Sequence, residues 1–298
     1  MRPPDYILLK QRILFIVNPI SGGLNKISIP TLIDENLDLD KFDAEIIYTD
    51  FPHHAKQLAS EGLAQNFDIV AAVGGDGTIN EVADVLESSG KIMAIVPCGS
   101  GNGLARTLGV PLNTAKAIAR INNLNFTAID VGLLNDKKFF NMAGMGFDAH
   151  ISAHFANSKK RGFFGYLKST LKEVSSYRPQ HYKIHIGDKK LSVDAFMLSL
   201  ANSSQYGNNA HISPTASLKD GLLDICIIKP FPLKVFPILG WRMFSKTAHK
   251  SKYVDIIKAN DFSVLRQTDG PVHVDGEPLN MGETLNVSVK KLALNIII

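Results

Sequence analysis

Three glycine-rich segments in the N-terminal half of the chain combine residue types that suit a phosphate ligand. They are NPISGG at 18–23, GGDGTINEV at 74–82 and PCGSGNGLAR at 97–106. Each directly follows a short apolar run, and glycine allows the backbone N–H groups of such a turn to approach an oxyanion closely. Asp76 would repel a bare phosphate unless a cation lay between them. Together the segments therefore predict a site for a phosphate and Mg²⁺.

The middle segment has the pattern of a strand-to-helix turn. Thr78 and Glu81 have the S/T-x-x-D/E spacing of a capping box, which predicts a helix that begins near Ile79. Residues 74–77 would then form the turn before it, with backbone N–H groups and the helix dipole directed at one point. A tight turn with a capping threonine is the alternative if this segment is taken alone.

The common nucleotide-binding motifs do not match. The chain has no GxxxxGK(S/T) sequence, and GSGNG at 99–103 lacks the GxGxxG spacing. A Walker-type ATPase and a Rossmann dehydrogenase are therefore disfavoured.

The elements that must position these segments alternate along the first half of the chain. Apolar runs without polar alternation predict strands buried on both faces, at 13–18, 45–48, 69–73 and 92–96. Helices are expected at 30–37, 53–65, 79–87, 104–108 and 114–121. This alternation predicts a parallel α/β layer, which places all three glycine segments at one edge of the sheet, where such sheets bind ligands.

After about residue 125 the sequence pattern changes. Many shorter strand candidates follow, such as YKIHIG, VDAFMLSLA and TLNVSVKKLALNIII, with helices expected near 162–174 and 233–246. We therefore expect an α/β domain at 1–127 and a mostly antiparallel β domain at 128–298. The length of 298 residues agrees with two domains.

Composition limits the class of protein. The net charge of +4, from 32 basic and 28 acidic residues, is too small to indicate a nucleic-acid partner. Cys98 and Cys226 form no disulfide framework, which favours a reducing, cytoplasmic setting with both thiols buried. The N-terminus lacks a signal-peptide pattern, and no apolar run approaches the ~18 residues of a membrane span. A soluble cytoplasmic protein is expected.

The motifs, in their order along the chain, resemble the diacylglycerol kinase catalytic-domain family, which also contains sphingosine kinases and soluble bacterial lipid kinases. The resemblance continues through FNMAGMGFDA at 140–149, SLKDGLLD at 217–224 and VDGEP at 274–278. It implies a three-layer α/β nucleotide-binding domain, similar to that of NAD kinase, followed by an antiparallel β-sandwich domain. It also implies that ATP and a lipid meet in the cleft between the two domains.

The resemblance further implies which residues contact ATP. Ser100 stands where the family usually has threonine, which keeps the hydroxyl, and Thr49 follows the second predicted strand. Because no P-loop lysine is present, Mg²⁺ is expected to supply more of the charge compensation that phosphoryl transfer needs. The complete set is Asn18, Pro19, Ser21, Gly22, Thr49, Gly74, Gly75, Asp76, Gly77, Thr78, Asn80, Ser100 and Asn102.

In VDGEP, Asp275 and Glu277 match the positions that supply the general base for the acceptor hydroxyl in the family. Residues two apart on a strand point to the same face, so we expect both carboxylates on one side of a strand. Which of them is the base stays open, and the other, with Asp76, would order the metal or its waters. A DG turn that closes a hairpin is the alternative.

Two further sites follow from the resemblance. SLKDGLLD is similar to the loop that holds a structural Mg²⁺ in bacterial members, through the Asp220 carboxylate and the backbone carbonyls of Ser217 and Leu222. Its alternative is a polar turn before a strand. Asp148 matches the position that members acting on amino-alcohol lipids use to read the polar head, and its alternative is the N-cap of a helix starting near Ala149.

Two segments mix basic and aromatic residues, KKRGFFGYLK at 159–168 and FPLKVFPILGWRMFSKTAHKSK at 231–252. Such a mixture suits an anionic membrane surface. In the second segment Phe236, Leu239 and Met243 have helical spacing, so core packing with a solvated basic face is the favoured alternative.

These expectations predict an ATP- and Mg²⁺-dependent lipid kinase that phosphorylates a hydroxyl of a membrane-derived lipid such as diacylglycerol. Peripheral contact with the inner face of the membrane is expected, and a nucleic-acid partner is not. NAD kinase is the enzymatic alternative, because that family also carries GGDGT in an N-terminal α/β domain. A catalytically silent nucleotide or lipid sensor is the other alternative. The sequence is compatible with a homodimer but does not determine the oligomeric state.

Overall fold

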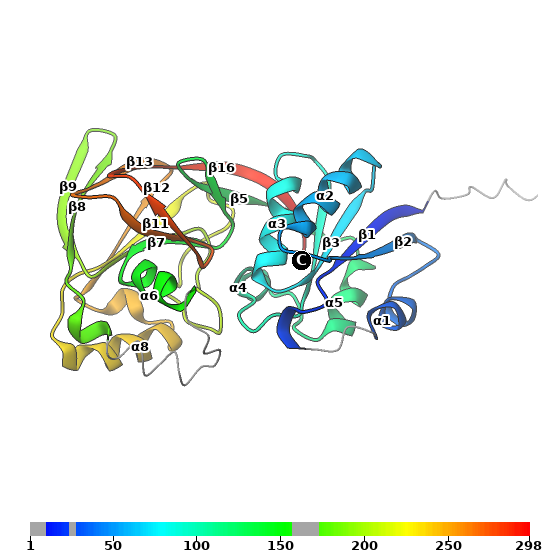
Figure 1. Cartoon of the computed structure of the whole chain (residues 1–298), viewed down its shortest axis with the longest axis horizontal. Helices are drawn as coiled ribbons and strands as arrows, with labels where there is room; N and C mark the ends of the chain where they lie inside the picture. Colours follow the sequence, from blue (N-terminus) through cyan, green and yellow to red (C-terminus); the bar gives the residue numbers. More distant parts are fainter. Residues whose placement is uncertain (1–9, 24–27, 157–172) are drawn as a thin grey trace, which may run out of the picture. The chain divides into compact units, whose positions relative to one another are not determined.

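The computed structural model describes residues 10–23, 28–156 and 173–298 (Figure 1). The chain divides into two compact units. Unit 1 ends at Ile129 and includes Ala293–Ile298, and unit 2 comprises Asp130–Leu292. From the sequence the last six residues are expected in the second domain. They belong to unit 1 instead, because the end of the last strand pairs with a strand of that unit.

The sheet of unit 1 is parallel. Its order is β2 (Phe42–Tyr48), β1 (Gln11–Val17), β3 (Ile69–Gly74) and β4 (Ile92–Pro97), and the end of β16 (Thr284–Ile297) pairs with β4. β3 is buried throughout, and β1 and β4 are buried over their last five residues, which explains their lack of polar alternation. The strand order reverses between β1 and β3, and such a switch point is where open α/β sheets bind ligands.

Helices cover both faces of this sheet. α1 (Ile29–Asn36) packs with α5 (Thr114–Ile121), and α2 (His54–Ala64) packs with α3 (Asp76–Leu86). The two pairs lie on opposite sides of the strands (Figure 1), as right-handed crossovers require when the strand order reverses. A short helix, α4 (Gly103–Thr107), begins within the third glycine segment. The three-layer α/β architecture is thereby confirmed.

α3 begins three residues earlier than the capping box predicts. Its first residue is Asp76, and its N-cap residue makes no side-chain capping bond. The Thr78 hydroxyl instead accepts a hydrogen bond from Asn18 Nδ2 at 3.0 Å. The Glu81 carboxylate accepts one from the Lys56 backbone N–H at 3.3 Å. The predicted capping box is therefore wrong, because both side chains bond to other segments.

Unit 2 is a sandwich of two sheets. The first has the order β12, β11, β10, β7, β14 and β15, with every neighbouring pair antiparallel. These strands are, in that order, Val254–Ala259, Leu223–Ile228, Met197–Ala201, Met142–Gly146, Gly270–Val274 and Glu277–Met281. The second sheet contains the start of β16, β13 (Asp261–Arg266), β8 (Gln180–Ile186), β9 (Lys189–Ala195), β5 (Phe126–Leu134) and β6 (Lys137–Phe139). The predicted antiparallel β-sandwich is confirmed.

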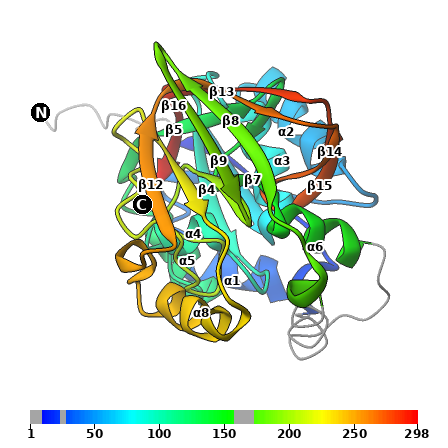
Figure 2. The same cartoon turned by 90° about the vertical axis from the view of Figure 1, so that its left-hand side faces the viewer.

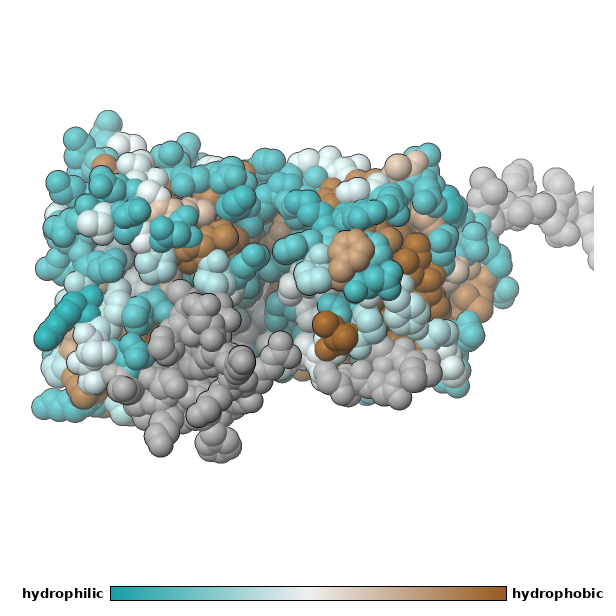
Figure 3. Space-filling model, in the orientation of Figure 1, coloured by the Kyte–Doolittle hydropathy of each residue, from teal (hydrophilic) through white to brown (hydrophobic). Residues whose placement is uncertain are grey.

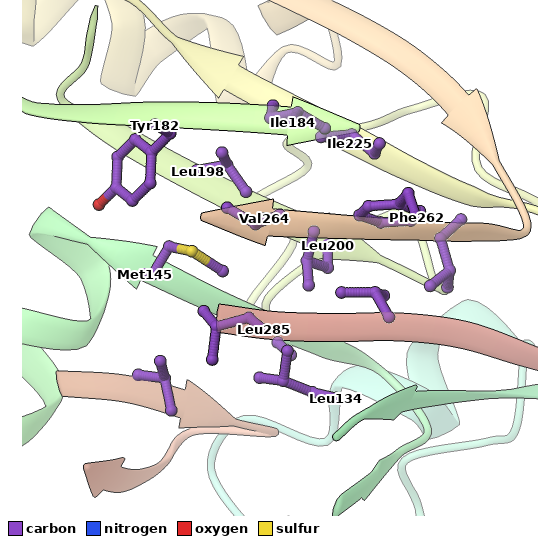
Figure 4. Packing of buried hydrophobic residues seen from close by; sticks show 14 of the residues in the cluster. Leu134, Met145, Tyr182, Ile184, Leu198, Leu200, Ile225, Phe262, Val264 and Leu285 are labelled. Carbon is purple, nitrogen blue, oxygen red and sulfur yellow. The ribbon is translucent and has the colours of Figure 1, made fainter. Parts of the chain in front are cut away.

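The core of unit 2 lies between the two sheets. Alternate residues of the first sheet, such as Leu198, Leu200 and Ile225, share one buried cluster with Tyr182 and Val264 of the second (Figure 4). This alternation follows from the period of two that a strand imposes on its side chains. The intervening residues of β10 and β11 consequently point to the other face of the first sheet.

That other face is covered by two helices, α6 (Phe147–Ala156) and α8 (Phe236–Phe244). Met197 and Cys226 from the strands form a second buried cluster there with Leu239 of α8. Figures 1 and 2 both draw α6 and α8 below the strands of this unit. The central strands β7, β10 and β11 of the first sheet are therefore buried on both faces.

Two predicted helices have different outcomes. The helix expected near 162–174 falls largely outside the described residues, and the KKRGFFGYLK segment falls entirely outside them. The helix expected at 233–246 is present as a single turn, Leu233–Val235, followed by α8. In the described part of the chain, none of the helices has the length and hydropathy that crossing a bilayer requires.

Candidate active site

The three glycine segments meet at the carboxyl edge of the unit 1 sheet. Gly22 has a φ of 68°, and a Cβ placed on it would lie 1.6 Å from the carbonyl oxygen of Cys98. A Cβ on Gly99 would lie 2.7 Å from the Cα of Gly75. Because a side chain at either position would overlap backbone atoms, glycine is needed for the loops to pack on one another.

Asp76 joins the second segment to the third. Its Oδ2 accepts a hydrogen bond from the Asn102 backbone N–H at 2.8 Å, and its Oδ1 accepts one from the Gly103 backbone N–H at 2.9 Å. Gly101 passes close by, since a Cβ there would lie 2.8 Å from Asp76 Oδ2. The carboxylate therefore holds the first residues of α4 in place. Its expected position beside a cation stays a prediction.

Two asparagines add hydrogen bonds, one within the third segment and one between the first and second. Asn102 has a left-handed φ of 52°. Its Oδ1 accepts the Gly99 N–H at 3.1 Å, and its Nδ2 donates to the Gly99 carbonyl at 2.8 Å. Asn18 reaches from the first segment to Thr78 of the second, as described above. The segments are thus held by specific hydrogen bonds that do not involve a ligand.

The first turn of α3 retains donors for a ligand. The first hydrogen bond of the helix runs from the Ile79 N–H to the Gly75 carbonyl at 3.0 Å. The N–H groups of Asp76, Gly77 and Thr78 precede it and, within the described residues, donate to no other group. Unsatisfied N–H groups and the positive end of the helix dipole make this turn suitable for an oxyanion.

The remaining predicted ATP contacts lie on the same loops or beside them. Ser100 is exposed on the third segment, and Asn80 is half-buried on α3. Thr49 is buried directly after β2. Pro19 and Ser21 belong to the first segment. The predicted nucleotide residues therefore all follow strands of unit 1 at the same edge.

The VDGEP segment of unit 2 is a hairpin turn. Asp275 and Gly276, with φ of 48° and 87°, connect β14 to β15, and Val274 pairs with Glu277. Two consecutive positive φ values belong to the type I′ turn that Asp-Gly favours. The expectation that both carboxylates project from one face of a strand is therefore wrong, because a turn separates them.

The Asp275 carboxylate is fully engaged by the backbone at the start of β7. Its Oδ2 accepts the Phe140 N–H at 2.8 Å, and its Oδ1 accepts the Asn141 and Met142 N–H groups at 2.9 and 2.7 Å. Burial raises the pKa of Asp275 to about 6, although these three donors and the charge of His273 act in the opposite direction.

Glu277 has the opposite environment. It is the first residue of β15, its side chain is exposed, and its carboxylate forms no hydrogen bond or ion pair with the described residues. An exposed and unengaged carboxylate of this kind is able to accept a proton from a bound hydroxyl.

Asp148 lies in a polar cluster at the start of α6. Its Oδ1 accepts the Ala149 N–H at 2.8 Å. Its Oδ2 accepts hydrogen bonds from Ser199 Oγ at 3.1 Å and Tyr206 Oη at 3.2 Å, and it lies 3.0 Å from His273 Nε2. α6 begins at Phe147, so the N-cap interpretation is wrong. The role as a lipid-head contact stays a prediction.

The sequence did not predict Ser199, Tyr206 or His273 as partners of this carboxylate. Ser199 and His273 pair with Gly144 of β7 from either side. A Cβ on Gly144 would lie 2.3 Å from Asp148 Oδ2, so the glycine makes room for the carboxylate between the flanking strands. The alternation of residues along single strands could not predict this cluster, because the cluster joins residues that are far apart along the chain.

A lysine side chain from the neighbouring strand β12 lies against the SLKDGLLD loop. Lys258 Nζ lies 3.1 Å from Asp220 Oδ2 and 2.7 Å from Asp224 Oδ1. Partial burial opposes the charge of Lys258, but the two aspartates raise its pKa above the ordinary value. Asp220 Oδ1 also accepts the Leu222 N–H at 3.1 Å. The carboxylate expected to bind a structural metal is therefore already neutralised by a lysine.

The surrounding residues do not add a ligand set. Ser217 Oγ accepts the Lys219 N–H at 3.2 Å, and the buried Asp130 accepts the Gly221 N–H at 2.6 Å. Among the described residues, no group of three or more His, Cys, Asp or Glu side chains is placed to hold a metal. A divalent ion bound to the Asp220 carboxylate would compete with Lys258 for it. The metal role of Ser217, Asp220 and Leu222 stays a prediction.

Comparison with solved structures agrees with this fold. The crystal structure of a diacylglycerol kinase from Bacillus anthracis superposes with a TM-score of 0.75 at 22% sequence identity, covering 96% of each chain. A parallel α/β unit followed by an antiparallel sandwich is thus a fold that the two chains share.

Sequence comparison defines the family. The profile of the diacylglycerol kinase catalytic domain matches residues 12–134, and that of the YegS C-terminal NAD kinase beta sandwich-like domain matches residues 141–298. A Pseudomonas aeruginosa protein named "Probable lipid kinase YegS-like" is 32% identical over 249 residues, covering 81% of this chain and 80% of that relative. A Staphylococcus saprophyticus "Diacylglycerol kinase" is 28% identical over 276 residues, covering 90% of both. The chain belongs to the diacylglycerol kinase family of lipid kinases.

Gly22→Ala should destabilise the protein through the contact with Cys98. Gly109 is a matched control, because its φ of 67° is nearly the same but no atom lies within 4 Å of a Cβ there. Both variants carry the cost of a left-handed alanine, about 1 kcal/mol. We expect Gly22→Ala to lower the Tm further by at least about 3 °C. Equal Tm values for the two variants would contradict the loop packing described here.

Lys258 should make the stability of the nucleotide-free protein independent of divalent metal. We expect its Tm to differ by less than about 1 °C between Mg²⁺ and EDTA. Lys258→Met leaves the buried Asp224 unpaired, so it should lower the Tm, with partial recovery on adding Mg²⁺. A Mg²⁺-dependent rise in the wild-type Tm that disappears in Asp220→Asn would instead establish a metal site in this loop, whether or not Lys258→Met folds.

Proposed function

We propose that the protein transfers the γ-phosphate of ATP, in the presence of Mg²⁺, to a hydroxyl of a membrane-derived lipid, with diacylglycerol as the first acceptor to test. The observation that carries this proposal is the unsatisfied first turn of α3 at the centre of three interlocked glycine loops. Membership of a lipid kinase family supports the type of acceptor, and the relative named "Diacylglycerol kinase" supports the choice of diacylglycerol.

In this proposal unit 1 binds ATP mainly through its backbone. The N-H groups of Asp76, Gly77 and Thr78 receive phosphate oxygens, and the exposed hydroxyl of Ser100 adds a further donor. Mg²⁺ bound with the nucleotide supplies the positive charge that the absent P-loop lysine would otherwise provide. Asp76 contributes chiefly by holding the third loop at the correct distance, through its bonds to Asn102 and Gly103.

Glu277 is the general base in this proposal, and Asp275 is a positioning residue. Both Asp275 oxygens are occupied by backbone N–H groups, so accepting a proton there would disrupt the contact between the hairpin and β7. Glu277 has no such engagement within the described residues. Its backbone position is fixed by pairing with Val274 across the turn, so the side chain is presented from an ordered site.

Asp148 is proposed to set the polarity around the head of the acceptor. Its Oδ2 already has Ser199, Tyr206 and His273 as partners. Burial and the Asp148 charge raise the pKa of Tyr206, so its phenol stays a proton donor. A polar head entering this cluster would exchange hydrogen bonds with the Tyr206 and Ser199 hydroxyls.

The function is tested by transfer of labelled γ-phosphate from ATP in Mg²⁺ buffer to detergent-dispersed diacylglycerol, monoacylglycerol, phosphatidylglycerol, sphingosine and undecaprenol. NAD is included as an acceptor because the second unit matches a NAD kinase-like profile. We expect labelled lipid and no labelled NAD. Labelled NAD alone would assign the chain to the enzymatic alternative. ATP binding without any labelled product would favour a sensor.

Glu277→Gln and Asp275→Asn should separate catalysis from positioning. Glu277→Gln is expected to lower kcat about 10²–10⁴-fold, the usual contribution of a general base, with an unchanged Tm because the side chain is exposed. Asp275→Asn places an amide NH₂ against backbone donors and should lower the Tm. The assignment fails if Glu277→Gln keeps full activity, or if Asp275→Asn loses activity with an unchanged Tm.

A further inference from the structure

α8 is apolar on two opposite faces. Phe236, Leu239 and Met243 pack against the buried cluster beneath the helix. On the other side Ile238, Trp241 and Phe244 are 52%, 66% and 56% exposed. These three residues are spaced three apart, so they follow one face of the helix. A helix that is apolar all round is normally covered on all sides, and this one is covered on one side by the described residues.

The outer face continues into the turn before the helix, where Leu233 is 55% exposed. We define the α8 outer face as Leu233, Ile238, Trp241 and Phe244. On the face drawn in Figure 3, hydrophobic residues stand in small groups among many hydrophilic ones. Four large apolar side chains within twelve residues of sequence are therefore a concentrated patch, and such patches mark contact surfaces.

The charge around this face is strongly positive. Residues 225–254 contain six Lys or Arg and no Asp or Glu, whereas the whole chain has a net charge of only +4. Lys229 is paired with Asp255 at 3.0 Å. Lys234, Arg242, Lys246 and Lys250 form no ion pair with the described residues. Most of the positive charge of this segment is therefore not neutralised by acidic side chains among the described residues.

We propose that the α8 outer face docks on an anionic lipid bilayer. Apolar side chains with a basic rim are the composition of an interfacial helix, and each Lys or Arg near an anionic surface adds about 1 kcal/mol of attraction. A second copy of the protein is a poorer partner, because a symmetric contact would bring two basic rims together. This inference rests on the proposed function in one respect: a bilayer is where the acceptor lipid resides.

The inner face of α8 connects the proposed docking surface to α6. Its inner residues belong to the same cluster as Phe147 and Ile151 of α6, the helix that carries Asp148. Met197 of β10 also belongs to this cluster, whereas its neighbour Leu198 faces the sandwich core on the other side of the sheet. One helix therefore separates the docked surface from the apolar residues beside the Asp148 cluster.

Trp241 provides a direct test, because it is the single tryptophan of the chain. The protein is mixed with vesicles of phosphatidylglycerol and phosphatidylcholine in equal parts, or of phosphatidylcholine alone, without ATP. We expect a blue shift of tryptophan emission with the anionic vesicles, weakened by added salt, and little shift with phosphatidylcholine. No shift with the anionic vesicles would overturn the proposal.

Variants that retain Trp241 test the two components of the face. Phe244→Ser and Lys246→Glu should each weaken vesicle binding roughly tenfold. Matched controls are Phe126→Ser, at an aromatic residue 48% exposed in unit 1, and Lys189→Glu on the β8–β9 hairpin. Equal losses in test and control variants would contradict the assignment to α8. Concentration-dependent dimerisation that Phe244→Ser abolishes would assign the face to a second copy instead.

Kinase assays distinguish this proposal from the proposed function. With acceptor in detergent, Phe244→Ser should match the wild type, whereas with acceptor in anionic vesicles it should lose about as much activity as it loses binding. If no lipid is phosphorylated by any variant while the vesicle shift persists, the proposed function fails and the docking stands. Loss of activity in both assays, with vesicle binding unchanged, would place Phe244 outside the docking surface.

Discussion

The structure of unit 1 depends on the close contact of three backbone loops, which the Asp76 carboxylate holds together. Gly22 lies against the Cys98 carbonyl and Gly99 against Gly75, so a side chain at either interface would force the loops apart. Asp76 adds two charge-assisted hydrogen bonds to the start of α4, and these are stronger than bonds between neutral groups. The first N–H groups of α3 have no partner among the described residues, because other groups hold the loops together.

The same device recurs in unit 2. Asp275 collects three backbone N–H groups, and Asp130 collects those of Gly221 and Leu292 at 2.6 and 2.8 Å. A carboxylate removed from water is costly unless donors replace its hydration, and backbone N–H groups supply those donors without a counter-ion. Acidic residues in sequence motifs of this kind can therefore be acceptors that shape the backbone. Glu277 stands apart because its carboxylate has no such donors among the described residues, and for this reason we propose it as the base.

The sequence was sufficient for the features that depend on local pattern. Uninterrupted apolar runs located β1, β3 and β4, and the succession of short strands indicated the sandwich. Features that depend on distant partners were not predictable. Thr78 bonds to Asn18, sixty residues earlier, so its capping spacing was misleading. Lys258, on the neighbouring strand β12, forms ion pairs with Asp220 and Asp224. No residue close to either aspartate in the sequence predicts this cation. Ala293–Ile298 likewise belong to unit 1 because the end of β16 pairs with β4. A change in sequence pattern near residue 125 cannot predict this pairing.

α8 shows how one sequence pattern can satisfy two interpretations. The spacing of Phe236, Leu239 and Met243 correctly indicated packing against a core, but the same helix also carries Ile238, Trp241 and Phe244 on its opposite side. Core packing alone accounts for the first set and leaves the second exposed to water, at a cost of about 25 cal/mol for each Å² of apolar surface. Since a solvated face would be served by polar residues, an apolar outer face beside lysines that pair with none of the described acidic residues is better explained by a surface that offers both hydrocarbon and negative charge. An anionic bilayer provides these together, and water provides neither.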